Sequence, residues 1–147
     1  DCYNNRIKFD TDRREHILTE LGEWLSLGKT LRAFCRRTDI ANMPSNMLVY
    51  EWINSDAEMK KRIAHARDVG YDAIADEIIE IIDNAANDMV EDSDGNMRLN
   101  SEHVQRAKLK AKFRLKLLSK WSPKKYGEKL DITANVTSHE STLDELD

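Results

Sequence analysis

The sequence predicts a mainly α-helical protein, and three observations support this fold class. Apolar residues recur at intervals of three and four in several stretches, which is the spacing of one face of a helix. Only five glycines and two prolines occur among 147 residues, so few of these stretches are interrupted. A charged fraction of 34% beside a hydrophobic fraction of 40% is typical of helices with one buried and one exposed face.

The chain begins with a segment that has no periodicity. We interpret residues 1–10 as a flexible arm. A first helix is expected from Thr11 onward, where Asp12 and Glu15 have the spacing of a capping box. Its apolar residues follow helical spacing until the chain reaches Gly28, which is expected to end it.

Two shorter helices are expected to follow, capped by Thr30 and Ser45. Three short helices with a tight connection before the third are the skeleton of a helix-turn-helix domain, here residues 11–54. The last helix of such a domain enters the major groove of DNA, so we expect DNA contacts from Ser45, Asn46 and Tyr50. Phosphate contacts are expected from the cations that precede this helix, namely Lys29, Arg32, Arg36 and Arg37.

Residues 55–127 are expected to form a long helical hairpin. Ser55 and Glu58 have capping-box spacing for a helix that runs toward Asn87, and a turn follows at Asp92–Asn96. Residues 56–100 carry twelve acidic and five basic side chains, whereas residues 101–130 carry two acidic and ten basic ones. We therefore expect the acidic and the basic helix to attract each other along much of the hairpin.

The basic helix, expected over residues 101–121, has apolar residues on two opposite faces. A surface helix of a monomer needs only one such face. We expect one face to pack within the chain and the other against another copy of it. The first face consists of Val104, Ala107, Ala111, Leu115 and Leu118, and the second, assigned to oligomerisation, of Leu109, Phe113 and Leu117.

The last part of the chain has the alternation of a β-strand. Ile132, Ala134 and Val136 alternate with polar residues, and we assign a strand to residues 128–138. A lone strand is not stable by itself, so we expect strands from several subunits to form a shared barrel. Residues 139–147 have the composition of an acidic, disordered tail.

The sequence offers no catalytic motif, and we expect no enzyme activity, no cofactor and no metal site. No glycine-rich phosphate loop is present, and no histidine or cysteine pair has metal-ligand spacing. The turn at Asp92–Asn96 resembles part of a calcium loop, but its register places Val90 where a carboxylate is required. The two cysteines imply no disulfide framework. No apolar run has the length of a membrane span.

Several motifs, in order, resemble the small terminase subunit of tailed bacteriophages. They are Met43-Pro44-Ser45 leading to Trp52, Ala64-His65-Ala66-Arg67-Asp68, Asp72-Ala73, Asp76-Glu77-Ile78 and Pro123-Lys124-Lys125-Tyr126-Gly127. The resemblance implies a ring of about eight or more subunits that binds double-stranded viral concatemers in the host cytoplasm. It also implies delivery of this DNA to the large terminase subunit, which supplies ATPase and nuclease and is regulated by the small one.

Two other functions fit the residues alone. A dimeric helix-turn-helix transcription regulator would share the N-terminal domain and use the hairpin to dimerise. A protein scaffold without DNA would use the basic helix to bind acidic partners. Subunit number distinguishes the ring from the dimer, and a DNA-binding assay distinguishes the scaffold from both.

Overall fold

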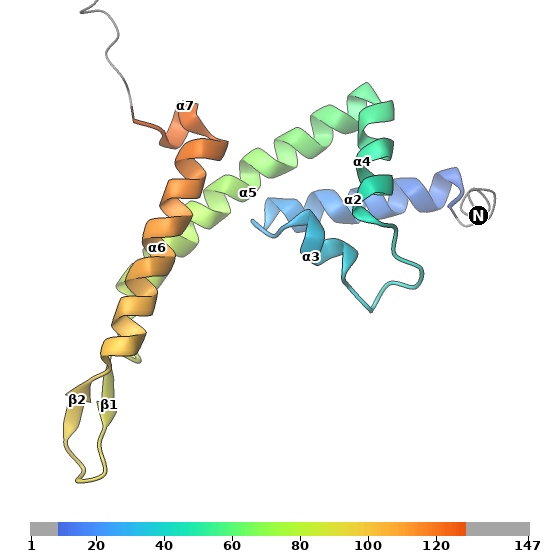
Figure 1. The fold of residues 1–147 in the computed structure, drawn as a ribbon. Helices are drawn as coiled ribbons and strands as arrows, with labels where there is room; N and C mark the ends of the chain where they lie inside the picture. The colour runs from blue at the N-terminus through green and yellow to red at the C-terminus, as the bar shows by residue number, and fades with distance from the viewer. Residues whose placement is uncertain (1–8, 129–147) are drawn as a thin grey trace, which may run out of the picture.

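The computed structural model describes residues 9–128, which form six helices and one small antiparallel sheet (Figure 1). The predicted mainly helical fold class is therefore confirmed for this part of the chain. Most of the predicted arm, the strand residues Ile132, Ala134 and Val136, and the acidic tail lie outside the described residues. The elements are α2 (Thr11–Ser26), α3 (Leu31–Cys35), α4 (Asn46–Ser55), α5 (Ala57–Asp83), β1 (Met89–Glu91), β2 (Met97–Leu99), α6 (Ser101–Trp121) and α7 (Pro123–Tyr126).

The first hydrophobic core lies between α2, α3, α4 and the N-terminal half of α5. The fully buried Leu21 and Phe34 are at its centre, and Phe9 packs edge-on against Trp52 with ring centroids 5.1 Å apart. Phe9 thus belongs to the core, although the sequence placed it in the arm. The remaining buried side chains are Ile17, Leu18, Leu25, Leu31, Val49, Ile53, Met59, Ile63 and Ala66.

Side-chain caps begin the helices of this core, and two of them differ from the prediction. The predicted caps Thr30 and Ser45 are confirmed, since each accepts a hydrogen bond from a backbone N–H in the first turn. At α2 the cap is Asp10 in place of the predicted Asp12 and Glu15 pair. At α5 it is Asp56, whose carboxylate accepts from two backbone N–H groups, in place of Ser55. In both cases several neighbouring residues can cap, and tertiary packing decides which one does.

The connection between α3 and α4 is long, whereas the sequence predicted a tight one. It spans residues 36–45 and is held against the core by partly buried Met43 and buried Pro44. The Arg13 guanidinium also donates to the backbone carbonyl of Ala41. The trihelical arrangement is therefore present, but its turn is a longer loop fixed by side chains.

Helix α5 belongs to two cores. Its N-terminal half packs on α2 and α4, and its C-terminal half lies beside α6 (Figure 1). The backbones of α2 and α5 meet at Gly70, where an added Cβ would lie 2.0 Å from the carbonyl oxygen of Leu25. Gly28, just after α2, also lies against α5 near Gly70, and its φ of +78° is one that glycine adopts readily. Only glycine at position 70 permits so close an approach of the two helices.

The second core is the predicted helical hairpin. Ile78, Ala111 and Leu118 are buried between α5 and α6, and Arg114 forms an ion pair with Glu77 at 2.6 Å. This is the one ion pair recorded between α5 and α6 in residues 9–128, so opposite charges do not line the hairpin as expected. Leu115, predicted to pack inside the chain, is exposed because the face toward α5 is narrower than the apolar stripe.

A β-hairpin joins α5 to α6, and the sequence prediction missed its two strands. Helix α5 ends at Asp83 instead of continuing toward Asn87, and β1 pairs with β2 in antiparallel register. The predicted turn is the tip of this hairpin. The carboxylate of Asp92 accepts hydrogen bonds from the backbone N–H groups of Asp94 and Asn96, and Gly95 has φ +80°. Among residues 9–128, every helix is too short or too polar to span a bilayer.

Candidate nucleic-acid interface

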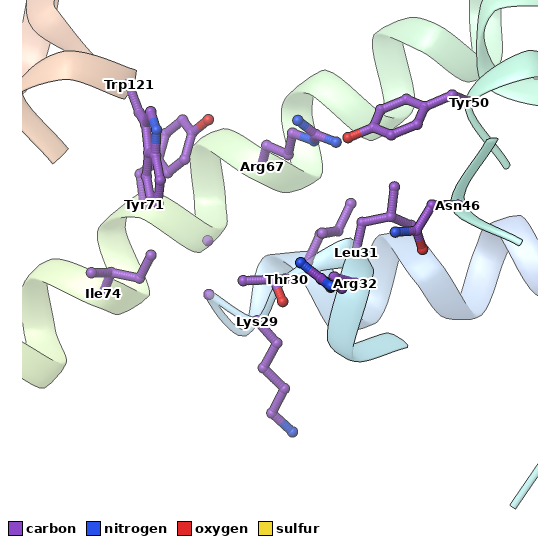
Figure 2. A pocket seen from close by; sticks show the side chains of 13 residues that line it. Lys29, Thr30, Leu31, Arg32, Asn46, Tyr50, Arg67, Tyr71, Ile74 and Trp121 are labelled. Carbon is purple, nitrogen blue, oxygen red and sulfur yellow. The ribbon is translucent and has the colours of Figure 1, made fainter. Parts of the chain in front are cut away.

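A cleft of about 370 Å³ lies between the N-terminal core and the hairpin (Figure 2). Four of the seven predicted DNA-binding residues contribute to its wall, namely Lys29, Arg32, Asn46 and Tyr50. The structure therefore brings the N-terminus of α4 together with the cations that precede and begin α3. The rest of the wall consists of Leu25, Gly28, Thr30, Leu31, Arg67, Gly70, Tyr71, Ile74 and Trp121.

The two predicted cations of the cleft are exposed. The Lys29 ammonium lies 4.3 Å from the ring centroid of Trp24, whose indole N–H donates to the Thr30 carbonyl at 2.9 Å. Arg32 follows on the first turn of α3 and is also exposed. Both positive charges are thus available to solvent and to a ligand.

The other two predicted cations, Arg36 and Arg37, differ in their surroundings. Arg36 is exposed, whereas the guanidinium of Arg37 pairs with Asp39 through two hydrogen bonds and with Glu20 at 3.4 Å. Hydrogen bonding between Arg37 and Asp39 raises the pKa of Arg37 and lowers the pKa of Asp39. The charge of Arg37 is therefore balanced within the protein.

The three predicted residues of α4 also have distinct roles in the structure. The Ser45 hydroxyl accepts from the Leu48 backbone N–H at 3.3 Å, which caps the helix. Asn46 is partly buried at the cleft, and Tyr50 is exposed one turn further along. Asn46 and Tyr50 are thus the members of this set whose side chains face the cleft, and Ser45 holds the end of the helix in place.

The sequence prediction did not assign two features of this cleft. Arg67 of α5 contributes a third cation, and its Nε atom is buried without a hydrogen-bond partner. On the opposite wall, Tyr71 and Trp121 stack with ring centroids 5.9 Å apart and an interplanar angle of 29°. The resemblance motif contained Arg67, but no local pattern indicates that this side chain faces α3 and α4.

The hairpin leaves two apolar faces exposed. The predicted oligomerisation residues of α6 are all exposed, and Phe113 keeps 58% of its accessible surface. On α5, Ile79 and Ile82 are exposed next to acidic residues, and Ile82 keeps 66%. The neighbours of the α6 face are exposed lysines: Lys108, Lys110, Lys112, Lys116 and Lys120.

The Pro-Lys-Lys-Tyr-Gly motif packs against the middle of α5. The Asp72 carboxylate accepts hydrogen bonds from the Lys125 ammonium at 2.5 Å and the Tyr126 hydroxyl at 2.6 Å. These two hydrogen bonds lower the pKa of Asp72, and they raise the pKa values of Lys125 and Tyr126. The motif therefore fixes α7 against α5.

Together these features define a class of small helical proteins in which a trihelical unit with a basic cleft is joined to a long helical hairpin. Comparison with known families matches residues 13–133 to the family described as bacteriophage Sf6, terminase small subunit-like. The chain belongs to this family, which is generally non-catalytic and has a role in phage DNA packaging.

Solved structures agree with this assignment. The chain is similar to the terminase small subunit of the bacterial virus Sf6, in three structures that each carry one substitution. In the first, identity is 27%, the TM-score is 0.58, and 79% of this chain and 78% of that chain are covered. The other two have 26% identity, TM-scores of 0.56 and 0.57, and coverage of 78% of this chain with 81% and 77% of theirs. A search of curated proteins found no match.

Proposed function

We propose that this protein initiates viral genome packaging as a non-enzymatic ring of about eight or more subunits. The ring binds double-stranded concatemeric DNA in the host cytoplasm, delivers it to the large terminase subunit and regulates that subunit's ATPase and nuclease. In this proposal residues 11–54 form the DNA-binding domain and residues 55–127 the oligomerisation domain. The barrel strand at 128–138 remains a prediction.

The observation that carries this proposal is the pair of unlike exposed faces on the hairpin. The α5 face combines Ile79 and Ile82 with exposed carboxylates at Asp76, Glu80 and Asp83. The α6 face combines apolar side chains with lysines. Each face supplies the charge that the other lacks, and both leave large apolar side chains in water.

Such a pair of faces favours a ring over a dimer. When the α5 face of one subunit contacts the α6 face of the next, the contact is head-to-tail, and an open chain of subunits has one free face at each of its two ends. A head-to-tail contact closes only when the ring is complete. A two-fold dimer would instead pair a face with itself and bring like charges together across the interface.

Ring formation also makes weak DNA contacts effective. Each subunit offers Lys29, Arg32 and Arg36 as exposed cations near α4, and single phosphate contacts are sensitive to salt. A ring presents many such sets at high effective concentration, so weak contacts add up to a useful affinity. Because Arg37 is balanced by acidic neighbours, we expect it to contribute less than Arg36.

Native mass spectrometry of the Phe113→Asp variant tests the ring. We expect the wild type at about eight or more subunits and the variant as small species, because a carboxylate replaces the apolar centre of the α6 face. Met47→Asp is the matched control, since Met47 is 83% exposed but lies on α4, away from the hairpin. It should leave the subunit number unchanged.

Three results would contradict the proposal in different ways. A wild-type dimer would favour the transcription regulator. A Phe113→Asp variant that keeps the full oligomer would remove the α6 face from the interface. A ring that fails to retain duplex DNA at low salt would favour a protein scaffold.

A further inference from the structure

All the charged side chains in the wall of the cleft are positive. Its wall contains Lys29, Arg32 and Arg67, and none of its residues is an aspartate or glutamate. This is unusual in a chain with 27 acidic and 23 basic side chains and a net charge of −4. The Lys29 ammonium lies over the Trp24 ring and points away from Arg67 (Figure 2), so the arginines Arg32 and Arg67 are the charges that attract an anion into the cavity.

Arg67 differs from the other arginines of the long helices. Its Nε atom is buried and has neither a hydrogen bond nor an ion pair among residues 9–128. Arg62 on the same helix pairs with Glu15 at 2.8 Å, and Arg114 on α6 pairs with Glu77 at 2.6 Å. A buried N–H donor without an acceptor is costly, and an anion in the cleft would supply the missing acceptor.

The two arginines of the cleft lie on different helices. Arg32 begins α3 in the N-terminal unit, and Arg67 lies on α5, which continues into the hairpin. In Figure 2 the side chains of Arg67 and Tyr50 point toward each other, so the exposed face of α4 opens onto the same space. An anion held there would contact α3, α4 and α5 together.

We propose that this cleft is a phosphate-binding site in which Arg67 and Arg32 hold one phosphate of the DNA backbone. The proposal rests on the proposed DNA-binding function and extends the DNA contact from the trihelical unit to α5. A guanidinium suits this role because its planar set of donors matches the oxygens of a phosphate. DNA bound in this way contacts the long helix α5 as well as the trihelical unit.

The test is the salt dependence of duplex DNA binding by the full chain. The affinity falls as salt rises, and Arg67→Gln and Arg32→Gln should each make this fall of log K with log salt less steep by about 0.9 for every engaged subunit. This corresponds to roughly an eightfold loss of affinity at 0.1 M salt. Arg67→Lys should keep most of the slope. Lys60→Gln is the matched control, because Lys60 is an exposed cation of α5 outside the cleft.

A thermal melt separates binding from folding. Since Arg67 Nε has no partner, Arg67→Gln should melt at or above the wild-type temperature, whereas a purely structural role would lower it. An unchanged slope in Arg67→Gln, with wild-type binding intact, overturns the inference and leaves the proposed function standing. Absence of DNA binding by the wild type instead removes the proposed function.

A second arm distinguishes DNA from a free phosphate. Titration of the wild type with inorganic phosphate, without DNA, is followed by calorimetry and repeated on Arg67→Gln. Weak or no binding of inorganic phosphate, together with the lowered DNA slope, supports the backbone phosphate. Tight binding that Arg67→Gln abolishes, with an unchanged DNA slope, assigns the cleft to a free phosphate and overturns the DNA contact.

Discussion

Replacement of Gly70 by alanine tests the close contact between α2 and α5. The new Cβ would lie 2.0 Å from the Leu25 carbonyl oxygen, whereas ordinary contact begins at 3.4 Å, so the helices must separate by about 1.4 Å (3.4 − 2.0). Because the obstacle is backbone, no rotamer change relieves it. We expect the upper part of the usual overpacking cost, about 3 kcal/mol, offset by about 1 kcal/mol of helix propensity.

The net loss of about 2 kcal/mol corresponds to a melting temperature lower by roughly 8 °C for a chain of this size. Thermal unfolding followed by circular dichroism at fixed protein concentration measures it. The matched control is Gly22→Ala, where nothing lies within 4 Å of the added Cβ. The same chemical change there should stabilise the protein by about 0.5–1 kcal/mol.

Opposite signs for the two substitutions are the central expectation. If Gly70→Ala melts at or above the wild-type temperature while Gly22→Ala also rises, the helices are not in contact at Leu25. The orientation of the trihelical unit on the hairpin would then need another explanation.

Three further predictions concern separate parts of the molecule. Arg36→Ala should weaken DNA retention in a gel shift at moderate salt without altering ring size. Arg37→Ala should weaken it less, because Asp39 and Glu20 already balance that charge. Leu118→Ala should cost about 2–5 kcal/mol in urea unfolding, since it empties a fully buried site of the hairpin core. The Asp72 contact should depend on pH. Its pKa is lowered by folding, so its stabilisation is complete above the ordinary value of 3.8 and disappears as the pH falls through the lower folded value. The melting difference between wild type and Asp72→Asn, measured from pH 2 to 7, should therefore be constant at neutral pH and shrink only in acid.

Periodicity was sufficient to predict α2 to α6 because each of these helices has a buried apolar face, whereas α7, which has four residues and no buried side chain, was not predicted. The stripe of Met59, Ile63 and Ala66 is buried as its spacing indicates. The β-hairpin was missed although Asp94-Gly95 is a strong turn signal, because each strand has only three residues and all of them are exposed. Such strands lack the alternation of buried apolar and exposed polar residues by which a strand is recognised in a sequence.

The candidate site was predictable only where the relevant residues lie close together in sequence. Lys29 and Arg32 flank the start of α3, so the sequence alone shows that they lie close together. Arg67 joins them because α5 crosses the N-terminal unit at Gly70, which no local pattern specifies. The pairing of Arg37 with Glu20 likewise depends on how α2 packs near the start of the loop.

The single helix α5 serves both hydrophobic cores, and this has a consequence for how the protein opens. Its 27 residues extend over about 40 Å without interruption. If either core came apart, half of α5 would become an isolated amphipathic helix, which is marginally stable in water. We therefore expect the amide protons of both halves to exchange with solvent through the same cooperative opening, so that the two cores behave as one unfolding unit.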